Sequence, residues 1–330
     1  MSLRIIKQGM LTTIQDRGRF GYQDIGVPWG GAMDDYALRL ANLLVGNNES
    51  EACVEFTMAG TQMYFEEDAV VAFTGGGARI FVNERPVPLW RSLYIKAYRL
   101  IVLQPDQGCR TYLSVAGGFK TEPVMGSQST YIQGKLGGWL GRSLIANDLI
   151  PQSHQYTNQN KKIRNDFHCT EDVAIAHWSL SPLTYKFYSH PEVRVIRGQE
   201  WDWFEHDSQN EFFSEEFRIS MQSNRMGYRL DGSPMKKSIK EDLISSAVTK
   251  GSIQVTPDNN MVLLMSDAQT TGGYPRIGQV AEVDLPICAQ LKPGDPIRFR
   301  EISIGESENL LMEREKEIEQ LKDTIALRFS

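Results

Sequence analysis

The sequence predicts a mainly β protein with two related β domains in tandem and a helix at its C-terminus. Between residues 53 and 103, short apolar runs are separated by turn residues at close intervals, which is typical of an antiparallel barrel or sandwich rather than of alternating strands and helices. A second β-rich segment opens with the run at 193–197 and ends with the run at 297–301. Residues 306–329 are rich in Glu, Lys, Leu and Met, which favour a helix.

These patterns divide the chain into four parts. We expect the first domain at residues 1–150, a polar connection at 151–190, the second domain at 191–304 and the C-terminal helix at 305–330. The connection is assigned because residues 151–170 are polar and have no periodicity. Within the first domain, apolar residues between Met33 and Leu44 recur on one helical face, and Gly46 is placed to end that helix.

The two halves of the chain repeat one another weakly but in the same order. Residues 15–24 resemble residues 222–231. Tyr22 matches Tyr228 at an offset of 206 positions, and a nearby pair of prolines has the same offset. We interpret this repeat as a duplicated β domain. A cleft between related halves is the default place for a small-molecule site.

Composition limits the classes of function. With 330 residues, of which 41% are hydrophobic and 23% charged, the chain has the size and composition of two globular domains. The net charge of −6 and the lack of a basic block argue against a nucleic-acid partner. Four cysteines stand far apart without ligand spacing, so we expect no metal site, no disulfide framework and a cytoplasmic location. No apolar run has the length of a signal peptide or membrane helix, so no membrane partner is expected.

One polar stretch is the strongest candidate for a functional site. Residues 266–276 (SDAQTTGGYPR) follow the apolar run at 261–265 and hold, within eleven residues, a carboxylate, an amide, two threonine hydroxyls, a phenol and a guanidinium. Its Gly pair, Gly272 and Gly273, leaves room for close approach by a ligand. A solvated turn needs only one or two residues of this kind. The crowding therefore indicates ligand binding, and the alternative is a loop rigidified by its own hydrogen bonds.

Four motifs of this chain resemble those of one protein family. They are TTIQDRGR at 12–19, GVP at 26–28 followed by GAMD at 31–34, SNRMG at 223–227 and QTTGGYP at 269–275. Together they look like the second subunit of the allophanate hydrolase and urea amidolyase-related family, over residues 3–302. The resemblance implies tandem cyclophilin-like β-barrel domains, in agreement with the internal repeat.

The resemblance implies one of three functions. The first is that of the C subunit of an ATP-dependent 5-oxoprolinase, which hydrolyses the lactam of 5-oxoproline to glutamate together with A and B subunits, with ATP and magnesium bound in the complex. The second is that of a regulatory antagonist that binds an inhibitor of a sensor histidine kinase. The third is carboxyl transfer in a biotin-dependent urea carboxylase, with biotin as cofactor. A chain of 330 residues without a biotin carboxylase or biotin carrier region favours the first two functions over the third, and of these we expect the first.

For lactam hydrolysis, we expect roles for nine residues, all of which except Glu241 lie in the polar stretch or the family motifs. Catalytic roles are expected of Asp267, Gln269, Arg276 and Glu241, and substrate binding is expected of Asn224, Arg225, Thr270, Thr271 and Tyr274. Arginines could offer planar bidentate donors to phosphate or carboxylate, and the amides and hydroxyls could orient an amide or a ribose. A carboxylate could hold magnesium or receive a proton.

Structural roles are open for several of these charged residues. Arg225 could pair with Asp231 or with another local carboxylate, and Asp267 could cap its own loop through hydrogen bonds. Structural pairing is also expected in the Gly-rich turn of the first domain, for Asp16, Arg17 and Arg19.

Overall fold

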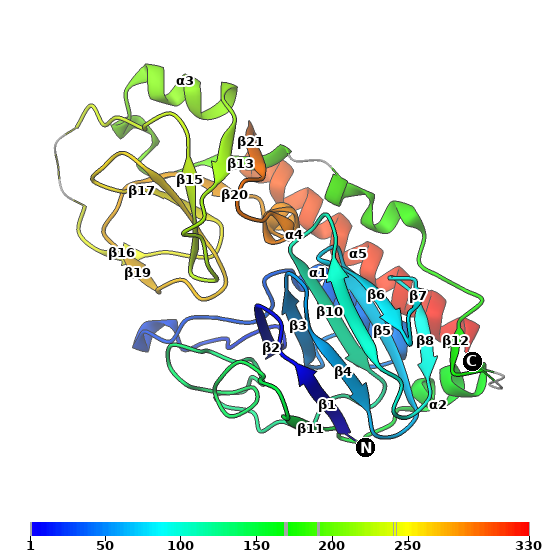
Figure 1. Cartoon of the computed structure of the whole chain (residues 1–330). Coiled ribbons are helices and arrows are strands. Elements are labelled where there is room, and N and C mark those ends of the chain that lie inside the picture. Colours follow the sequence, from blue (N-terminus) through cyan, green and yellow to red (C-terminus); the bar gives the residue numbers. More distant parts are fainter. Residues whose placement is uncertain (1, 168–170, 190–191, 240, 242, 330) are drawn as a thin grey trace. The chain divides into compact units, whose positions relative to one another are not determined.

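The protein is described by a computed structural model that covers residues 2–167, 171–189, 192–239, 241 and 243–329. Two compact units make up the chain. The first unit contains residues 1–19, 30–186 and 320–330, and the second contains residues 20–29 and 187–319. Among the described elements, strands outnumber helices in both units (Figure 1), which confirms the mainly β class.

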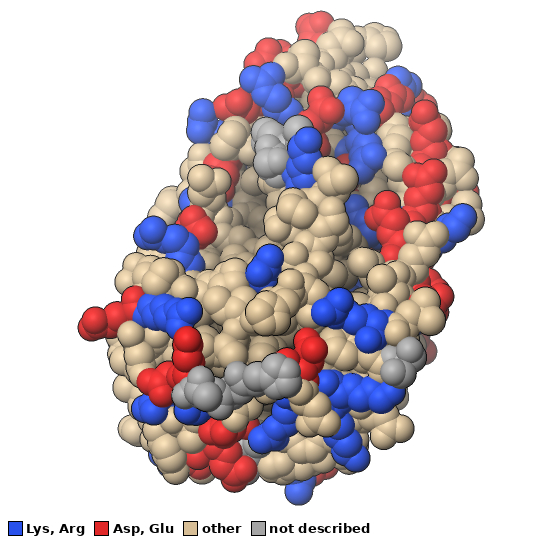
Figure 2. Space-filling view, turned by 90° about the vertical axis from the view of Figure 1, so that its right-hand side faces the viewer, with Lys and Arg blue, Asp and Glu red and all other residues tan. Residues whose placement is uncertain are grey.

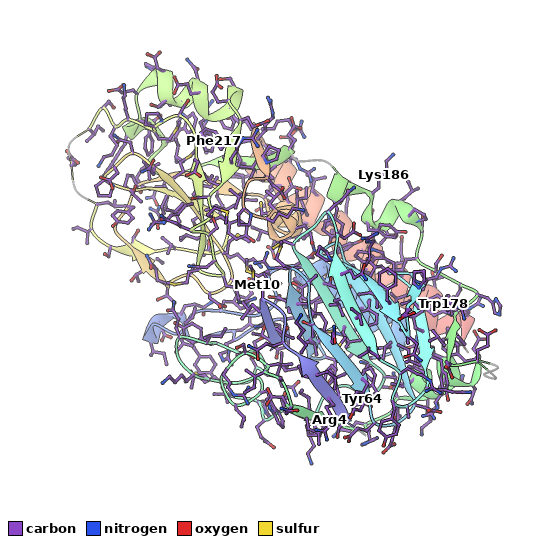
Figure 3. The ribbon with its side chains drawn as sticks, viewed as in Figure 1. Arg4, Met10, Tyr64, Trp178, Lys186 and Phe217 are labelled. Atoms are coloured by element: carbon purple, nitrogen blue, oxygen red, sulfur yellow. The ribbon has the colours of Figure 1, made fainter. Side chains whose placement is uncertain are left out.

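The first unit is built from two antiparallel sheets of six strands each. In spatial order, the first sheet consists of β11 (Leu149–Pro151), β1 (Ser2–Lys7), β4 (Gln62–Phe65), β9 (Ile101–Pro105), β6 (Ala78–Val82) and β7 (Arg85–Val87). The second sheet consists of β12 (Val173–Ile175), β8 (Ser92–Ile95), β5 (Ala69–Gly75), β10 (Arg110–Val115), β3 (Cys53–Thr57) and β2 (Leu11–Gln15). One continuous hydrophobic core joins the sheets, with Ile5 and Phe65 from the first and Phe73 and Leu113 from the second. On the adjacent strands β1 and β4, Arg4 and Tyr64 are cross-strand neighbours (Figure 3).

Helix α1 (Asp35–Val45) packs against β5 and β10 of the second sheet. These two strands are buried along their whole length, because the core covers one face and the helix covers the other. Asp34 caps the helix by accepting the N–H of Ala37 at 2.9 Å, and Gly46 ends it with a left-handed φ of 79°. The helix predicted between Met33 and Leu44 is therefore confirmed.

The segment predicted as a polar connection, residues 151–190, contains regular structure. It holds α2 (Asn158–Asn165), β12 and the 3-10 helix η2 (Pro182–Ser189). Strand β12 pairs with β8 of the second sheet, and the first unit includes this segment as far as residue 186. The domain boundaries drawn from the sequence stay a prediction.

The second unit contains a closed barrel of seven strands, as far as the described residues extend. In order around the barrel, these are β13 (Glu192–Arg197), β20 (Arg276–Val280), β17 (Ser252–Val255), β18 (Met261–Leu264), β15 (Gly227–Asp231), β14 (Phe217–Ile219) and β21 (Pro296–Glu301). Only β13 and β21 pair in parallel among these described strands. Phe217, labelled in Figure 3, is fully buried, and its ring centroid lies 5.9 Å from that of Phe299. Helix α3 (His206–Ser214) packs against β21.

Shorter elements complete the second unit, and a long helix ends the chain. The short elements are η1 (Gln23–Ile25), η3 (Trp201–Trp203), β16 (Ser246–Ala247), β19 (Thr271–Gly272), η4 (Glu282–Asp284) and α4 (Leu285–Gln290). The final helix, α5 (Ile304–Arg328), confirms the predicted C-terminal helix. Within the described part of the chain, no helix combines the length and the apolar character that a membrane span requires.

Charged side chains of both signs are mixed on the face drawn in Figure 2. Surface ion pairs of the first unit include Arg85 with Glu171 at 2.8 Å and Arg99 with Asp172 at 2.9 Å. Exposed pairs of this kind each contribute about 0–1 kcal/mol to stability. The charges that matter for the candidate site are instead buried.

Candidate functional site

Arg225 and Asp267, which were predicted from separate motifs, form a buried ion pair in the second unit. Arg225 Nε donates to Asp267 Oδ2 at 2.8 Å, and Arg225 Nη2 donates to Asp267 Oδ1 at 3.0 Å. The two side chains are only 6% and 7% exposed. This bidentate geometry matches the planar guanidinium to the carboxylate. Of the structural partners considered for Arg225, the observed carboxylate is thus Asp267 rather than Asp231.

The register of two barrel strands brings these residues together. Arg225 lies just before β15, and Asp267 lies just after β18. In this antiparallel pair, Gly227 is opposite Leu264, so the segments that flank the two strands leave the barrel side by side. The backbone pairing continues beyond the strands, because the Asp267 N–H donates to the Arg225 carbonyl at 2.9 Å.

Arg276 is held by Glu200, a residue that was not predicted to belong to the site. Its Nε donates to Glu200 Oε2 at 2.8 Å, its Nη2 to Glu200 Oε1 at 2.6 Å, and its backbone N–H to Oε2 at 3.0 Å. The guanidinium also donates to Gln199 Oε1 at 2.7 Å and to the Ala247 carbonyl at 3.2 Å. The Glu200 side chain is 5% exposed and that of Arg276 is 17% exposed.

The hydrogen bonds from Arg276 keep Glu200 ionised. Burial acts to raise the pKa of Glu200, but the donors of the Arg276 side chain and backbone outweigh burial and hold this pKa below its ordinary value. The hydrogen bond to Glu200 in turn raises the pKa of Arg276. Both groups are therefore charged at neutral pH, and each charge is neutralised by the other.

The loop between these two ion pairs is anchored at both ends and accessible in the middle. Asp267 anchors its start, and Arg276, the first residue of β20, anchors its end. The side chains in between that were predicted to act on a ligand are exposed or half-buried: Gln269, Thr270, Thr271 and Tyr274. Tyr274 is 42% exposed. This arrangement presents an amide, two hydroxyls and a phenol on a rigid frame.

Strand β19 and a buried glutamine shape the backbone of the loop. Within the loop, β19 pairs with β16 (Figure 1). Gln254 is buried and donates to the Tyr274 carbonyl at 3.3 Å. A Cβ atom on Gly272 would lie 2.5 Å from the Gln254 amide nitrogen. The space at Gly272, expected to admit a ligand, is therefore taken by the Gln254 side chain.

Asn224 and Glu241 are both exposed, but only Asn224 adjoins the ion pairs. Asn224 Oδ1 accepts the N–H of Met226 at 2.8 Å, in a local hydrogen bond typical of asparagine in turns, while its NH₂ group remains available as a donor. Glu241 lies on an irregular segment, and its carboxylate forms no hydrogen bond or ion pair with other described residues. The structure therefore brings Asn224, Arg225 and the loop together, and it shows no contact between them and Glu241.

The Gly-rich turn of the first unit has a structural role. The carboxylate of Asp16 accepts the hydroxyls of Ser127 and Ser129 at 2.6 and 2.5 Å. Arg17 Nε donates to Asp35 Oδ1 at 3.2 Å. The structural pairing predicted for Asp16 and Arg17 is confirmed.

Sequence reasoning missed Glu200 and Gln254 because neither lies in a recognisable motif. Glu200 follows β13, and the pairing of β13 with β20 places it beside Arg276. Gly198, between β13 and Glu200, has no room for a side chain, since a Cβ atom there would lie 2.1 Å from the Arg276 carbonyl oxygen. The sequence signal that could have identified Glu200 is a glycine directly after a predicted strand and just before a carboxylate.

The site offers neutral hydrogen-bonding groups rather than free charges. The guanidinium groups of Arg225 and Arg276 are paired with carboxylates, whereas the exposed or half-buried amide, hydroxyls and phenol can donate or accept hydrogen bonds. Groups of this kind can orient an amide, a lactam or a ureido ring. The part of the chain that the structure describes contains no group of three or more His, Cys, Asp or Glu side chains that could hold a metal ion.

Comparison with known proteins agrees with the motifs. Residues 25–301 match the family described as carboxyltransferase domain, subdomain A and B. The chain is 37% identical over 320 residues to the 5-oxoprolinase C subunit of Escherichia coli, with 97% of each chain covered, and 31% identical over 311 residues to the 5-oxoprolinase C subunit of Haemophilus influenzae, with 94% of each covered. Among solved structures, the urea amidolyase of K. lactis matches with a TM-score of 0.83 and 28% identity, over 97% of this chain and 20% of that chain. The resemblance is thus confirmed, and the chain belongs to the carboxyltransferase domain family, subdomains A and B.

Proposed function

We propose that this chain is the C subunit of an ATP-dependent 5-oxoprolinase, a hydrolase complex. The observation that carries the proposal is the match to two 5-oxoprolinase C subunits over 97% and 94% of both chains. The urea amidolyase of K. lactis is matched over only 20% of its length. In this role the chain would act with A and B subunits, and we place this complex in the cytoplasm.

In this proposal, the exposed middle of the 267–276 loop binds the lactam. Hydrolysis breaks the lactam C–N bond, places the oxygen of water on the carbonyl carbon and places a proton on the nitrogen. Gln269 and Asn224 can each donate to the lactam oxygen, where negative charge develops, and the hydroxyls of Thr270 and Thr271 can accept from the lactam N–H. The phenol of Tyr274 is a further donor at the same face of the loop.

Asp267 and Arg276 are positioning residues in this account. Their charged groups are engaged with Arg225 and Glu200, so they act on the substrate by holding the loop rather than by direct contact. Rigid support of this kind is what holds reacting groups in a productive geometry. Direct catalytic contact by Asp267, Arg276 or Glu241 stays a prediction of the sequence.

The loop has no carboxylate available to bind the magnesium ion of a magnesium-bound nucleotide. Magnesium prefers carboxylate oxygens together with phosphates, and the two carboxylates at the loop, Asp267 and Glu200, already bind arginines. When bound in the complex, ATP would supply the phosphoryl group that activates the lactam oxygen, and it would be released as ADP and inorganic phosphate. We place its binding site on one of the partner proteins.

The test is glutamate formation from 5-oxoproline by the chain mixed with its A and B partners. The proposal predicts turnover that requires ATP and all three proteins, and that is insensitive to avidin. A complete and folded mixture without turnover would rule the proposal out. Relief of kinase inhibition without turnover would instead support the regulatory function.

A second candidate function is carboxyl transfer from carboxybiotin. The chain is 30% identical, over 98% of its length, to a urea amidolyase of Lachancea kluyveri. The same amide and hydroxyl groups could orient the ureido ring of biotin. This function predicts dependence on a biotinylated carrier and inhibition by avidin, which separates it from the first proposal.

A further inference from the structure

A pocket in the first unit is formed by none of the residues of the 267–276 loop. Its cavity volume is about 90 Å³, which is several times the volume that one water needs. One wall is apolar and buried, and consists of Ala69 and Val70 from β5 with Val115 and Ala116 at the end of β10. The remaining lining residues are polar, and most of them come from the segment after β11 and from α2.

Gln152 is the unusual residue of this pocket. It is 2% exposed, and neither its side-chain oxygen nor its side-chain nitrogen has a hydrogen-bond partner among the described residues. Its backbone neighbours are regularly paired, because the Lys120 N–H donates to the Pro151 carbonyl at 2.8 Å and the Ser153 N–H donates to the Gly118 carbonyl at 3.0 Å. A buried carboxamide without partners costs free energy, and such exceptions in a folded protein require an explanation.

The exposed side of the pocket is cationic. Lys161 and Arg164, both on α2, line the pocket and are exposed. The one carboxylate among the lining residues, Asp68, already accepts the hydroxyl of Tyr94 and the backbone N–H of Ala97. The lining therefore combines an unsatisfied amide in its interior with two positive charges at its entrance.

From this combination we propose that the pocket binds a small lactam acid, a ring that carries a cis-amide and a carboxylate. A glutamine carboxamide presents a C=O acceptor and an N–H donor side by side. A lactam presents the complementary donor and acceptor on one edge, so the two amides can form a pair of hydrogen bonds, whereas an open-chain trans amide points its N–H and C=O in opposite directions. The carboxylate of the ligand would then face Lys161 and Arg164.

The inference includes a rotamer change that turns the Gln152 amide toward the cavity. Both amide atoms are buried. Turning the side chain toward the cavity breaks no hydrogen bond of the amide, because it has none to lose. Binding would therefore give two hydrogen bonds to an amide that has no partner among the described residues.

The test measures binding of 5-oxoproline by calorimetry to the isolated full-length chain that carries Gln269→Ala, so that the lactam site proposed on the 267–276 loop contributes less to the signal. The choice of this probe rests on the proposed function, but the measurement needs no partner protein and no turnover. We expect saturable binding with a Kd of about 1 mM or tighter. Proline, which lacks the amide carbonyl, 2-pyrrolidinone, which lacks the carboxylate, and N-acetylglycine, whose amide is trans, should each bind at least about tenfold more weakly.

Two variants connect this binding to the pocket. Gln152→Met keeps the size of the side chain, and we expect it to weaken binding at least about tenfold while the melting temperature does not fall. The double variant Lys161→Gln with Arg164→Gln should weaken binding, and Lys162→Gln on the same helix should not. Absence of binding at about 10 mM 5-oxoproline, or equal binding after Gln152→Met is added to the Gln269→Ala chain, would overturn the inference. A complex that turns over 5-oxoproline although this chain by itself does not bind it would overturn this inference alone.

Discussion

Arg19 in the first unit and Arg225 in the second occupy matching places in the internal repeat, 206 positions apart, yet they have different partners. Both side chains are buried, with residue exposures of 1% and 5%. Arg19 Nη2 donates to the backbone carbonyl of Ser129, whereas Arg225 forms a bidentate pair with the carboxylate of Asp267. The carboxylate near Arg19, that of Asp16, is instead satisfied by hydroxyl and amide donors.

The two regions differ in accessibility: the turn of the first unit is bound by another segment of the protein, whereas the middle of the loop in the second unit is accessible to a ligand. In the first unit, the Asp16 carboxylate binds residues 127–129 and thereby fixes that segment against the turn. In the second unit, Asp267 and Arg276 fix only the two ends of their loop, and the side chains between them remain accessible. Buried charged residues therefore fix the backbone in both units. Only in the second unit do they hold a loop with exposed polar side chains.

The largest effect is expected from removing the Asp267 carboxylate. Asp267→Ala leaves the Arg225 guanidinium buried without its carboxylate, which should lower the free energy of unfolding by about 3–5 kcal/mol. Chemical denaturation measures this loss. Asp231→Ala removes the same group from an exposed position of β15 and should change stability by less than about 0.5 kcal/mol. Similar values for the two variants would contradict a structural role for the buried pair.

A smaller and pH-dependent effect is expected at Glu200. Glu200→Gln should cost about 2 kcal/mol at pH 7, because the Arg276 guanidinium keeps its contacts with Gln199 and Ala247. The pKa of Glu200 is lowered by folding, so its stabilising effect is present above the ordinary glutamate pKa of about 4.3 and is lost as pH falls through the lower folded value.

Denaturation curves at several pH values test this sign. The difference between wild type and Glu200→Gln should be constant near neutral pH and should shrink below about pH 4.3. Glu192→Gln, which breaks an ion pair between side chains that are each 58% exposed, provides the control and should cost less than about 1 kcal/mol. A difference that grows as the solution becomes more acidic would show that Glu200 is not the stabilised anion.

The smallest loss of stability is expected from a change in the Gly-rich turn of the first unit. Asp16→Asn weakens the acceptor of the two hydroxyls and the backbone N–H of residues 127–129, and it should cost about 1–2 kcal/mol. Hydrogen exchange should accelerate at the Gln128 amide, whose N–H donates to Asp16 at 2.6 Å. Asp24→Asn, at an exposed position, is the matched control. A cost as large as that of Asp267→Ala would remove the contrast between the two units.

Local patterns in the sequence were sufficient for the fold class and for the main helices. Helix α1 follows from an apolar face with Asp34 and Gly46 at its ends, and α5 follows from its composition. The segment at 151–190 was harder to interpret, because the pairing of β12 with β8 depends on residues distant in the sequence.

The sequence identified most residues of the site but not which of them form ion pairs with one another. The crowding of polar residues identified the loop, and both Arg225 and Asp267 were included in the predicted site. Their mutual ion pair depends on the register of β15 and β18, which no local pattern specifies. Glu200 was missed for the same reason, since its partner Arg276 lies 76 residues further along the chain.

The central claim is that the exposed middle of the 267–276 loop contacts the substrate while the buried ion pairs only hold it. The most direct test is the rate of ATP-dependent glutamate formation by the complex that contains Gln269→Ala, compared with Gln320→Ala at an exposed position on α5. We predict that Gln269→Ala lowers kcat by about 10²-fold with an unchanged melting temperature, and that Gln320→Ala has no effect. Wild-type kcat and KM in Gln269→Ala would contradict the claim.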